Sequence, residues 1–429
     1  MKKSLLFSFM VAGLVMMSSC TKEKVIVMGG DDSNAAQQIV LQVANTGDGL
    51  QTRAGRPLYS SEAKQSVENV KVIICNKADN KVAYVDNIDS WNTVSTAYNT
   101  NGHGREKLLT LKNKLKAGSY VAYAFAYHST TDYSNLSTAI ADVAKDGTFN
   151  PNTALTLKDG VKGEEIFAGS VEFDVTDGVG FKRPIVLNRQ VAGTFGYFED
   201  VPYFAGATKL QLVASQRNTK LVLGEFANFD LLSNGKDDGH INYVVNGTEK
   251  ASDNVIYEIE LSEWFNALKD DNKDGLIDYD AANWKNPYAG AKFKTGSVFG
   301  GTFLIPFAKV GAEKTFVLKL TDDANHEYAT WTVKLPTTDK QTAEYTLKSW
   351  ETNSFVSASC TDITTTYNVV RNHLYGIGER ALDNPENPDK PTPDPSNPDK
   401  PEPLNKKQEL TLRVNDNWEV IHKMEIEQD

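Results

Sequence analysis

Apolar and polar residues alternate along most of the chain, and helical spacing is rare. The period of two predicts strands at 37–44, 70–75, 81–85, 107–111, 119–127, 171–175 and 184–188, with turn residues between them. A second series follows at 190–199, 209–214, 219–223, 254–260, 302–308, 315–320, 327–335 and 367–377. Many short strands with few helices predict an all-β fold of two sandwiches in tandem, with a boundary near residues 187–190.

Helical spacing occurs in two short segments, 134–145 and 261–269. The apolar residues that would share one helix face are Leu136, Ile140 and Val143 in the first segment, and Leu261, Phe265 and Leu268 in the second. We therefore expect these helices to be minor parts of a β protein.

The end of the chain has a strand pattern behind a proline-rich segment. Leu410, Leu412 and Val414 alternate with polar residues, and Trp418, Val420, Met424 and Ile426 continue the period of two. The preceding segment, 381–407, contains eight of the 15 prolines, which predicts an extended spacer that neither packs in a core nor joins a sheet. A strand at 408–429 on such a tether is expected to pair with another molecule, although it could also fold back on its own subunit.

The first twenty residues have the composition of an export signal. Lys2 and Lys3 precede an apolar run from Leu5 to Met17, which is too short to span a membrane permanently, and Cys20 follows two small residues. This pattern resembles a bacterial lipoprotein signal with Cys20 as the lipidated residue; the alternative is an ordinary secretory signal. Of the other cysteines, Cys75 is expected to be a buried free thiol, and its pairing with Cys360 stays open.

A candidate cleavage site follows the first predicted strand. In that strand Ile39, Leu41 and Val43 share one face, and a polar, glycine-containing stretch leads from it to Arg53. An arginine in such a loop suits a trypsin-like protease, which would cut between Arg53 and Ala54 or, alternatively, after Arg56. The strand before the cut and the strand at 408–429 have the same apolar period, so each could fill the same place in a sheet.

Charge and motifs exclude several classes of function. The net charge is −11 and no basic stripe is present, which argues against binding to nucleic acid or to an anionic membrane surface. The six histidines are scattered, and no nucleophile, dinucleotide or zinc motif occurs. We therefore expect a protein that is not an enzyme and requires no cofactor.

One loop has the spacing of calcium ligands. Asp270, Asn272 and Asp274 stand at alternate positions before a glycine, and Asp278 follows where a further ligand would be. Ala281 occupies the place of the closing glutamate. The segment is thus either a structural calcium site or an acidic, solvated turn.

Several segments together resemble one family. They are the lipoprotein signal, the step Thr52–Gly55, the run Ala117–Ala126, the segment Leu187–Ala192 and the segment Val369–Tyr375. In this order they resemble the FimA/Mfa-like fimbrillins, the type V pilins of Bacteroidota, and the proline-rich tether with its terminal strand is most similar to the Mfa-type shaft subunit.

The resemblance implies a domain plan. The sandwiches would be Greek-key, transthyretin-like domains. The expected parts are a signal peptide (1–20), a propeptide with a removable strand (21–53), two sandwiches (54–188 and 189–380), a tether (381–407) and a donor strand (408–429).

The resemblance also implies how the protein works. A palmitate-bearing precursor lipoprotein of the outer membrane would be cut by an arginine-specific protease, and identical subunits would polymerise by donor-strand exchange into an adhesive fimbrium with tip and anchor pilins. The receptor is not identified. The alternatives are a monomeric outer-membrane lipoprotein that binds glycan or protein, and a tip or anchor pilin.

Overall fold

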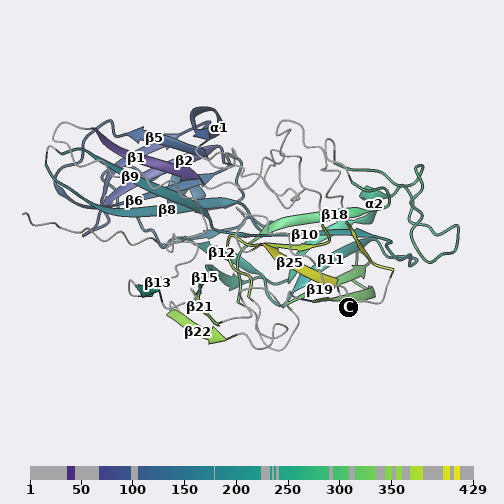
Figure 1. Ribbon diagram of the computed structural model, residues 1–429. Coiled ribbons are helices and arrows are strands. Elements are labelled where there is room, and N and C mark those ends of the chain that lie inside the picture. Colours follow the sequence, from purple (N-terminus) through teal and green to yellow (C-terminus); the bar gives the residue numbers. More distant parts are fainter. Residues whose placement is uncertain are drawn as a thin grey trace, which may run out of the picture.

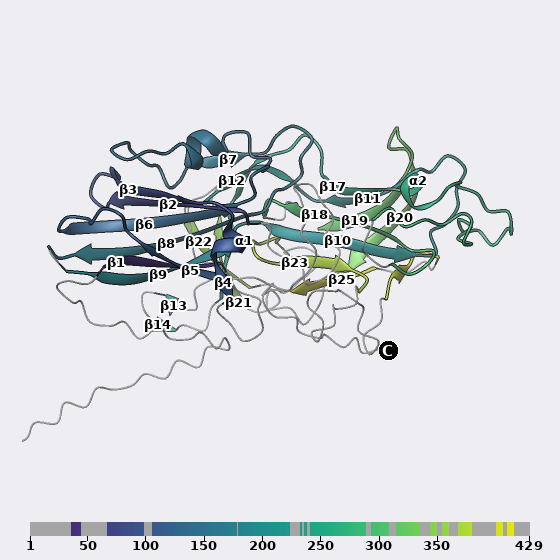
Figure 2. The ribbon, with the colours of Figure 1, turned by 90° about the horizontal axis from the view of Figure 1, so that it is seen from above.

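The computed structural model shows an all-β fold with minor helices, as the sequence predicts. Two large sheets lie in opposite halves of the molecule (Figures 1 and 2). The structure describes residues 36–43, 67–97, 105–177, 179–223, 232–233, 236–237, 241–288, 293–308, 315–334, 344–349, 354–359, 368–379, 400–405 and 410–415.

The first large sheet bends back on itself to form two layers. Strands β8 and β9 pair through two residue pairs, Phe167 with Arg189 and Ala168 with Asn188, and the sheet turns at this point. Side chains from both layers form one apolar core between them. In spatial order the strands are β3 (Val82–Ile88), β2 (Asn69–Asn76), β6 (Gly118–Tyr127), β8 (Ile166–Val175), β9 (Phe181–Arg189), β1 (Gln37–Val43), β5 (Arg105–Thr110) and β4 (Thr96–Ala97).

In the second large sheet, β20 and β25 pair through two residue pairs among the described residues. Its aromatic and aliphatic side chains form a core that continues onto the outer face of β2 and β6 in the first sheet. The strands are, in order, β17 (Val255–Glu260), β11 (Lys209–Ala214), β19 (Phe316–Thr321), β20 (Glu327–Lys334), β25 (Leu410–Asn415), β23 (Leu374–Ile377), β10 (Ala192–Glu199) and β18 (Val298–Leu304), with β24 (Glu402–Pro403) beside β10.

Smaller elements connect and cover the two large sheets. The helical elements are α1 (Trp91–Val94), η1 (Ser137–Ala141, a π-helical turn) and α2 (Leu261–Trp264). The small sheets are β16 (Gly247–Lys250), β12 (Asn218–Val222) and β7 (Ala154–Thr156); β15 (Ile241–Val245), β21 (Glu344–Ser349) and β22 (Ser354–Ser359); and β13 (Leu232–Ser233) with β14 (Lys236–Asp237).

Both predicted helices are too long, although their apolar residues do lie in the core or against it. In the first, the side chain of Asn135 accepts from the N–H of Thr156 and donates to the carbonyl of Ala154, so β7 holds this segment and a single turn remains. In the second, Phe265 is extended and forms a bridge with Trp284, which ends α2 after one turn. Tertiary contacts override the helical spacing in both places.

The prediction of a tether that neither packs nor joins a sheet is wrong at residues 400–405. Strand β24 pairs with Phe198 and Glu199 of β10, and the N–H of Leu404 donates to the carbonyl of Glu199 at 2.9 Å. Leu404 is 2% exposed and belongs to the core. An apolar residue with an N–H, directly after the last proline of the segment, is enough to anchor it. Residues 381–399 lie outside the described part of the chain.

The predicted strand at 367–377 is also shorter in the structure, where β23 spans Leu374–Ile377. The cause is a turn at Arg371 and Asn372, in which Asn372 has a left-handed φ of 57°. Asparagine tolerates this conformation, and a strand cannot continue through it.

Candidate functional site

Strand β1, the first predicted strand, is an interior strand of the first sheet. It pairs parallel to β9 through seven residue pairs and antiparallel to β5 through six. Figure 1 shows it in dark purple between these neighbours. Both edges of β1 are therefore paired, and its removal would leave two unpaired edges in the middle of a sheet.

The side chains of β1 face the core as the alternation predicts. Ile39, Leu41 and Val43 are each 0% exposed and belong to the core between the two layers, which confirms the predicted burial. The segment from this strand to the cleavage site, including Arg53 and Ala54, lies outside the described residues, as does Cys20. Processing at these positions stays a prediction.

Gln37 binds a loop through both ends of its side-chain amide. Its Oε1 accepts from the N–H of Leu115 at 2.6 Å, and its Nε2 donates to the carbonyl of Leu115 at 3.2 Å. The side chain is 2% exposed. Because a buried N–H and C=O both need partners, the residue at this position must offer an acceptor and a donor together.

The alternation in the sequence does not predict the role of Gln37. The available signal was a polar residue in phase with Ile39, Leu41 and Val43, which places an amide on the core side of a strand. Its partner, Leu115, is 78 positions away, and no local pattern connects the two.

The outer face of β1 carries two further amide contacts to β5. Gln38 Nε2 donates to Thr110 Oγ1 and Gln42 Nε2 donates to Glu106 Oε2, each at 3.2 Å. These side chains are partly buried. This face of the site is thus polar at its two ends.

The predicted donor strand begins in the second sheet of its own chain. Strand β25 pairs antiparallel with β23 through four residue pairs and parallel with β20 through two, as the yellow arrow in Figure 1 shows. Leu410 is 0% exposed. Leu412 and Val414 belong to the same strand, whereas Trp418, Val420 and Ile426 lie outside the described residues. Folding back on its own subunit is therefore the arrangement that the structure has for residues 410–415.

The segments Leu187–Ala192 and Val369–Tyr375, which carried part of the family resemblance, meet between the halves of the molecule. The N–H of Asn372 donates to the carbonyl of Val191, and the N–H of Gly193 donates to the carbonyl of His373, each at 2.9 Å. Arg371 Nη1 donates to Gln190 Oε1 at 2.6 Å, and both side chains are buried. These residues thus have a structural role, because their hydrogen bonds hold the start of β10 to the turn before β23.

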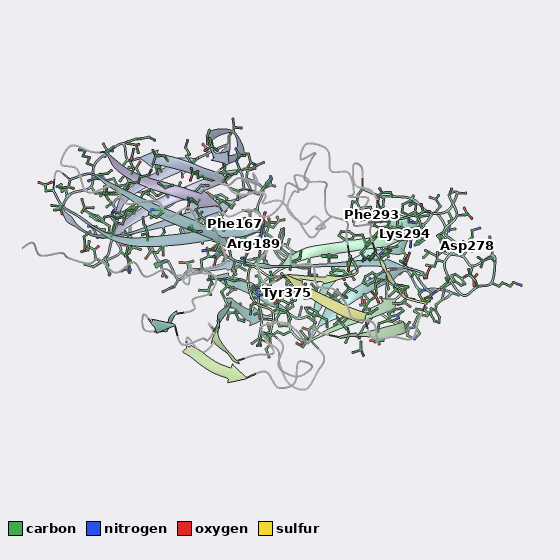
Figure 3. The ribbon with its side chains drawn as sticks, in the orientation of Figure 1. Phe167, Arg189, Asp278, Phe293, Lys294 and Tyr375 are labelled. Atoms are coloured by element: carbon green, nitrogen blue, oxygen red, sulfur yellow. The ribbon has the colours of Figure 1, made fainter. Side chains whose placement is uncertain are left out.

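A buried ion pair lies beside this junction. Arg189 Nε donates to Glu165 Oε1 at 2.7 Å, and the guanidinium lies over the ring of Phe167 at 4.8 Å. Figure 3 shows Arg189 and Phe167 close together between the two halves of the molecule. Burial, and then the charge of Glu165, raise the pKa of the neighbouring Glu164 to about 8. The backbone carbonyl of Glu164 accepts from the hydroxyl of Tyr133 at 2.7 Å. The junction therefore contains a carboxyl group that is easily protonated.

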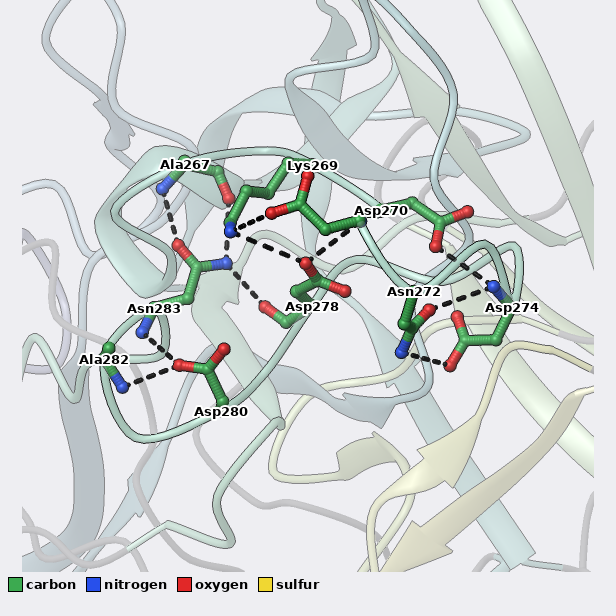
Figure 4. Close-up of polar contacts among 10 residues, drawn as sticks. Ala267, Lys269, Asp270, Asn272, Asp274, Asp278, Asp280, Ala282 and Asn283 are labelled. Carbon is green, nitrogen blue, oxygen red and sulfur yellow. Dashed lines mark hydrogen bonds and ion pairs between the residues drawn. The ribbon is translucent and has the colours of Figure 1, made fainter.

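In the expected calcium loop, the side-chain oxygens accept hydrogen bonds from backbone N–H groups of the loop itself (Figure 4). Asp270 accepts from the N–H groups of Asp274 and Gly275, at 3.1 and 3.0 Å, and Asn272 Oδ1 accepts from the N–H of Asp274 at 3.0 Å. Asp278 accepts from the N–H of Asp271 at 3.1 Å. The described residues include no group of three or more acidic, histidine or cysteine side chains arranged to hold a metal ion. Calcium binding here stays a prediction.

Two further sequence expectations concern cysteine and membrane segments. Cys75 is free and buried, as predicted, and burial raises its thiol pKa to about 12. Cys360 lies outside the described residues. Among the helices of the described ranges, none has the length and apolar character to span a membrane.

Comparison with solved structures finds fimbrial and surface proteins. The tip fimbrial protein Mfa3 from Porphyromonas gingivalis is 13% identical, with a TM-score of 0.36, covering 81% of this chain and 96% of its own. The fimbrial anchor protein Mfa2 from the same organism is 9% identical, with a TM-score of 0.34, covering 76% and 96%.

A third similar structure comes from Bacteroides thetaiotaomicron and is described as a candidate polysaccharide-binding protein. It is 13% identical, with a TM-score of 0.35, covering 80% of this chain and 91% of its own. No family model matches the chain, and no curated protein does. The chain is thus similar to Mfa-type fimbrial proteins, at an identity and a TM-score too low to transfer a function.

Proposed function

We propose that this chain is a structural subunit of a cell-surface fimbrium that polymerises by exchange of strand β1. The precursor is an outer-membrane lipoprotein lipidated at Cys20, and an arginine-specific protease cuts it after Arg53. Strand β1 then leaves, and the C-terminal strand of an identical subunit enters between β9 and β5. The observation that carries the proposal is that β1, the strand before the cleavage site, is paired on both edges and buried.

The energetics of the empty site drive assembly. Without β1 the facing edges of β9 and β5 would lose their ladder partners, and the core would lose three fully buried aliphatic side chains. Each such side chain contributes about 1.5–3 kcal/mol of burial. An open edge lined by apolar residues is a template for strand addition. The uncut precursor stays monomeric because β1 occupies the site.

Among the described residues, the C-terminal strand has four residue pairs with β23 and two with β20, whereas β1 has seven with β9 and six with β5. Within this part of the chain, the place of β1 therefore offers the longer ladder. Tip and anchor pilins are the expected partners at the two ends of the polymer. Assembly requires no cofactor, and calcium at Asp270–Asp278 is a separate expectation.

The test uses precursor that lacks residues 1–20. Brief trypsin treatment is followed by size-exclusion chromatography and by gels of unboiled samples. One control carries Arg53→Ala, and a second ends at Asn405, which keeps β24 on β10 and removes residues 406–429. We expect a multimer ladder that needs both the cut and residues 406–429. A chain that is cut after Arg53 and stays monomeric would contradict the proposal and favour a monomeric surface lipoprotein that binds glycan or protein.

A further inference from the structure

Strand β1 and the end of the chain have similar residues at alternate positions. Residues 37–43 read QQIVLQV and residues 408–414 read QELTLRV. Aligned in this way, a glutamine is followed at alternate positions by three aliphatic residues in both segments. Within residues 406–429, this is the one alignment that places aliphatic residues at the positions of Ile39, Leu41 and Val43 and an amide at the position of Gln37.

The first aligned position, that of Gln37, must supply hydrogen-bond partners for the backbone of Leu115. Once Gln37 has left, the N–H and the C=O of Leu115 need an acceptor and a donor from the same incoming residue. A glutamine at this position offers both, and an aliphatic or charged residue cannot. Gln408, which lies outside the described residues, is the residue that the alignment brings to this position.

The outer face of the site supports the same alignment through charge. Gln38 pairs with Lys182 of β9, and Gln42 pairs with Glu106 of β5. The alignment puts Glu409 opposite Lys182 and Arg413 opposite Glu106. Both charged residues of the incoming strand thus meet a residue of opposite charge. Opposite charges across a strand pair are favourable, and like charges are unfavourable.

The pairing with β5 brings these side chains close together. The N–H of Leu111 donates to the carbonyl of Gln37 at 2.9 Å, so the 37:111 pair is a hydrogen-bonded one. Because the two types of pair alternate in an antiparallel ladder, the pairs 38:110, 40:108 and 42:106 are non-hydrogen-bonded pairs with closer side chains. Val40 and Leu108 form the central one of these pairs.

We propose that Gln408–Val414 of one subunit replaces Gln37–Val43 of the next, residue for residue and in the same direction, parallel to β9. Gln408 takes the amide position at Leu115, and Arg413 lies beside Glu106. This inference rests on the proposed strand exchange and adds the register that makes an identical subunit the matching partner. The incoming strand has aliphatic residues at the three core positions of β1, and it adds two charge pairs that β1 does not make.

The test is disulfide trapping in a Cys360→Ser background, in which Cys75 stays because it is buried. The register predicts that Thr411→Cys on one subunit faces Leu108→Cys on the next. The matched controls combine Thr411→Cys with Glu106→Cys or with Thr110→Cys, two residues away on the same face, where Cα atoms about 7–8 Å apart are too distant for a disulfide. In the uncut precursor, Val40→Cys with Leu108→Cys serves as the positive control within one chain.

After trypsin and mild oxidation, we expect a ladder that survives boiling without reductant for the 411/108 pair and not for the control pairs. A polymer that forms normally but is trapped through 411/106 or 411/110, or through none of them, would overturn the register while strand exchange stands. If the parent protein forms no polymer after the cut, the proposed function fails and the register fails with it.

A second variant tests the amide position. Gln408→Met keeps the length of the side chain and leaves the N–H and C=O of Leu115 without partners. We expect subunits to leave the polymer at least about tenfold faster, because an unsatisfied buried pair of this kind weakens the contact by more than one decade. Lys407→Gln, one position before the matched segment, is the control and should leave the rate unchanged. Equal rates for Gln408→Met and the parent would refute the assignment.

Discussion

Replacing Leu41 by alanine should lower the free energy of unfolding of the precursor and leave the stability of the polymer unchanged. Leu41 is fully buried in the core between the two layers of the first sheet, with Lys107 and Ile185 as its register partners. Truncation of a buried leucine removes its burial energy and leaves a cavity, which together lower the free energy of unfolding by about 2–5 kcal/mol. For a unit of 150–250 residues this corresponds to a fall in the unfolding temperature of roughly 4–20 °C.

In the proposed mechanism the same substitution does not affect the polymer, because the cut after Arg53 removes β1 together with the rest of residues 21–53. The matched variant is Leu412→Ala, which aligns with Leu41 in the incoming strand. We expect Leu412→Ala to lower the temperature at which unboiled polymer dissociates in SDS by a comparable amount.

Circular dichroism of the uncut precursor and a temperature series of the polymer on gels measure the two effects. A lower dissociation temperature for the Leu41→Ala polymer would contradict the prediction, since β1 would then still be part of the assembled subunit. An unchanged unfolding temperature of the Leu41→Ala precursor would also contradict it, because Leu41 would then not contribute to the core.

Three other perturbations test the site and the junction. Gln37→Met should destabilise the precursor by about 1–3 kcal/mol in urea unfolding, because Leu115 loses both partners, whereas Gln38→Ala on the outer face should have little effect. Burial raises the folded pKa of Glu164 to about 8, above its ordinary value of 4.5, so its stabilising contribution is complete below pH 4.5 and is lost as the pH rises through 8. The free energy of unfolding should fall by on the order of a few kcal/mol over this range, and the unfolding temperature should decline with it between pH 5 and pH 8.5. Glu164→Gln should flatten that decline, and an unchanged slope would contradict the prediction. Arg189→Met should lower the free energy of unfolding by about 3–5 kcal/mol, because it removes the cation that pairs with the buried carboxylate of Glu165. Adding Glu165→Met should recover most of that loss, as a double-mutant cycle would measure.

The sequence predicted most strands because alternation is a local property. Strands β2, β6 and β11 contain the segments predicted at 70–75, 119–127 and 209–214. The first strand, predicted at 37–44 from the alternation that includes Ile39 and Leu41, is β1 in the structure. Burial of one face imposes a period of two on any strand, so the pattern can be seen without knowing the partner.

The errors arose where distant residues compete with a local preference. Asn135 holds β7 and shortens the first helix, and Phe265 pairs with Trp284 and ends the second. Residues 400–405 join the second sheet because Leu404 fits a buried position and its N–H finds the carbonyl of Glu199. Residue spacing and proline content predict only the local preference of a segment. The partners that override this preference here are distant in the sequence.

Alternation in the sequence was sufficient to predict which segments form strands, and it places aliphatic residues at the same alternate positions in residues 408–414 as in residues 37–43. Only the tertiary structure decided that β1 is an interior strand between β9 and β5, that Gln37 serves Leu115, and that β25 begins in the sheet of its own chain. The physical reason is that alternation follows from the backbone geometry of one strand. Pairing depends on which edges and buried polar groups the rest of the chain brings to it.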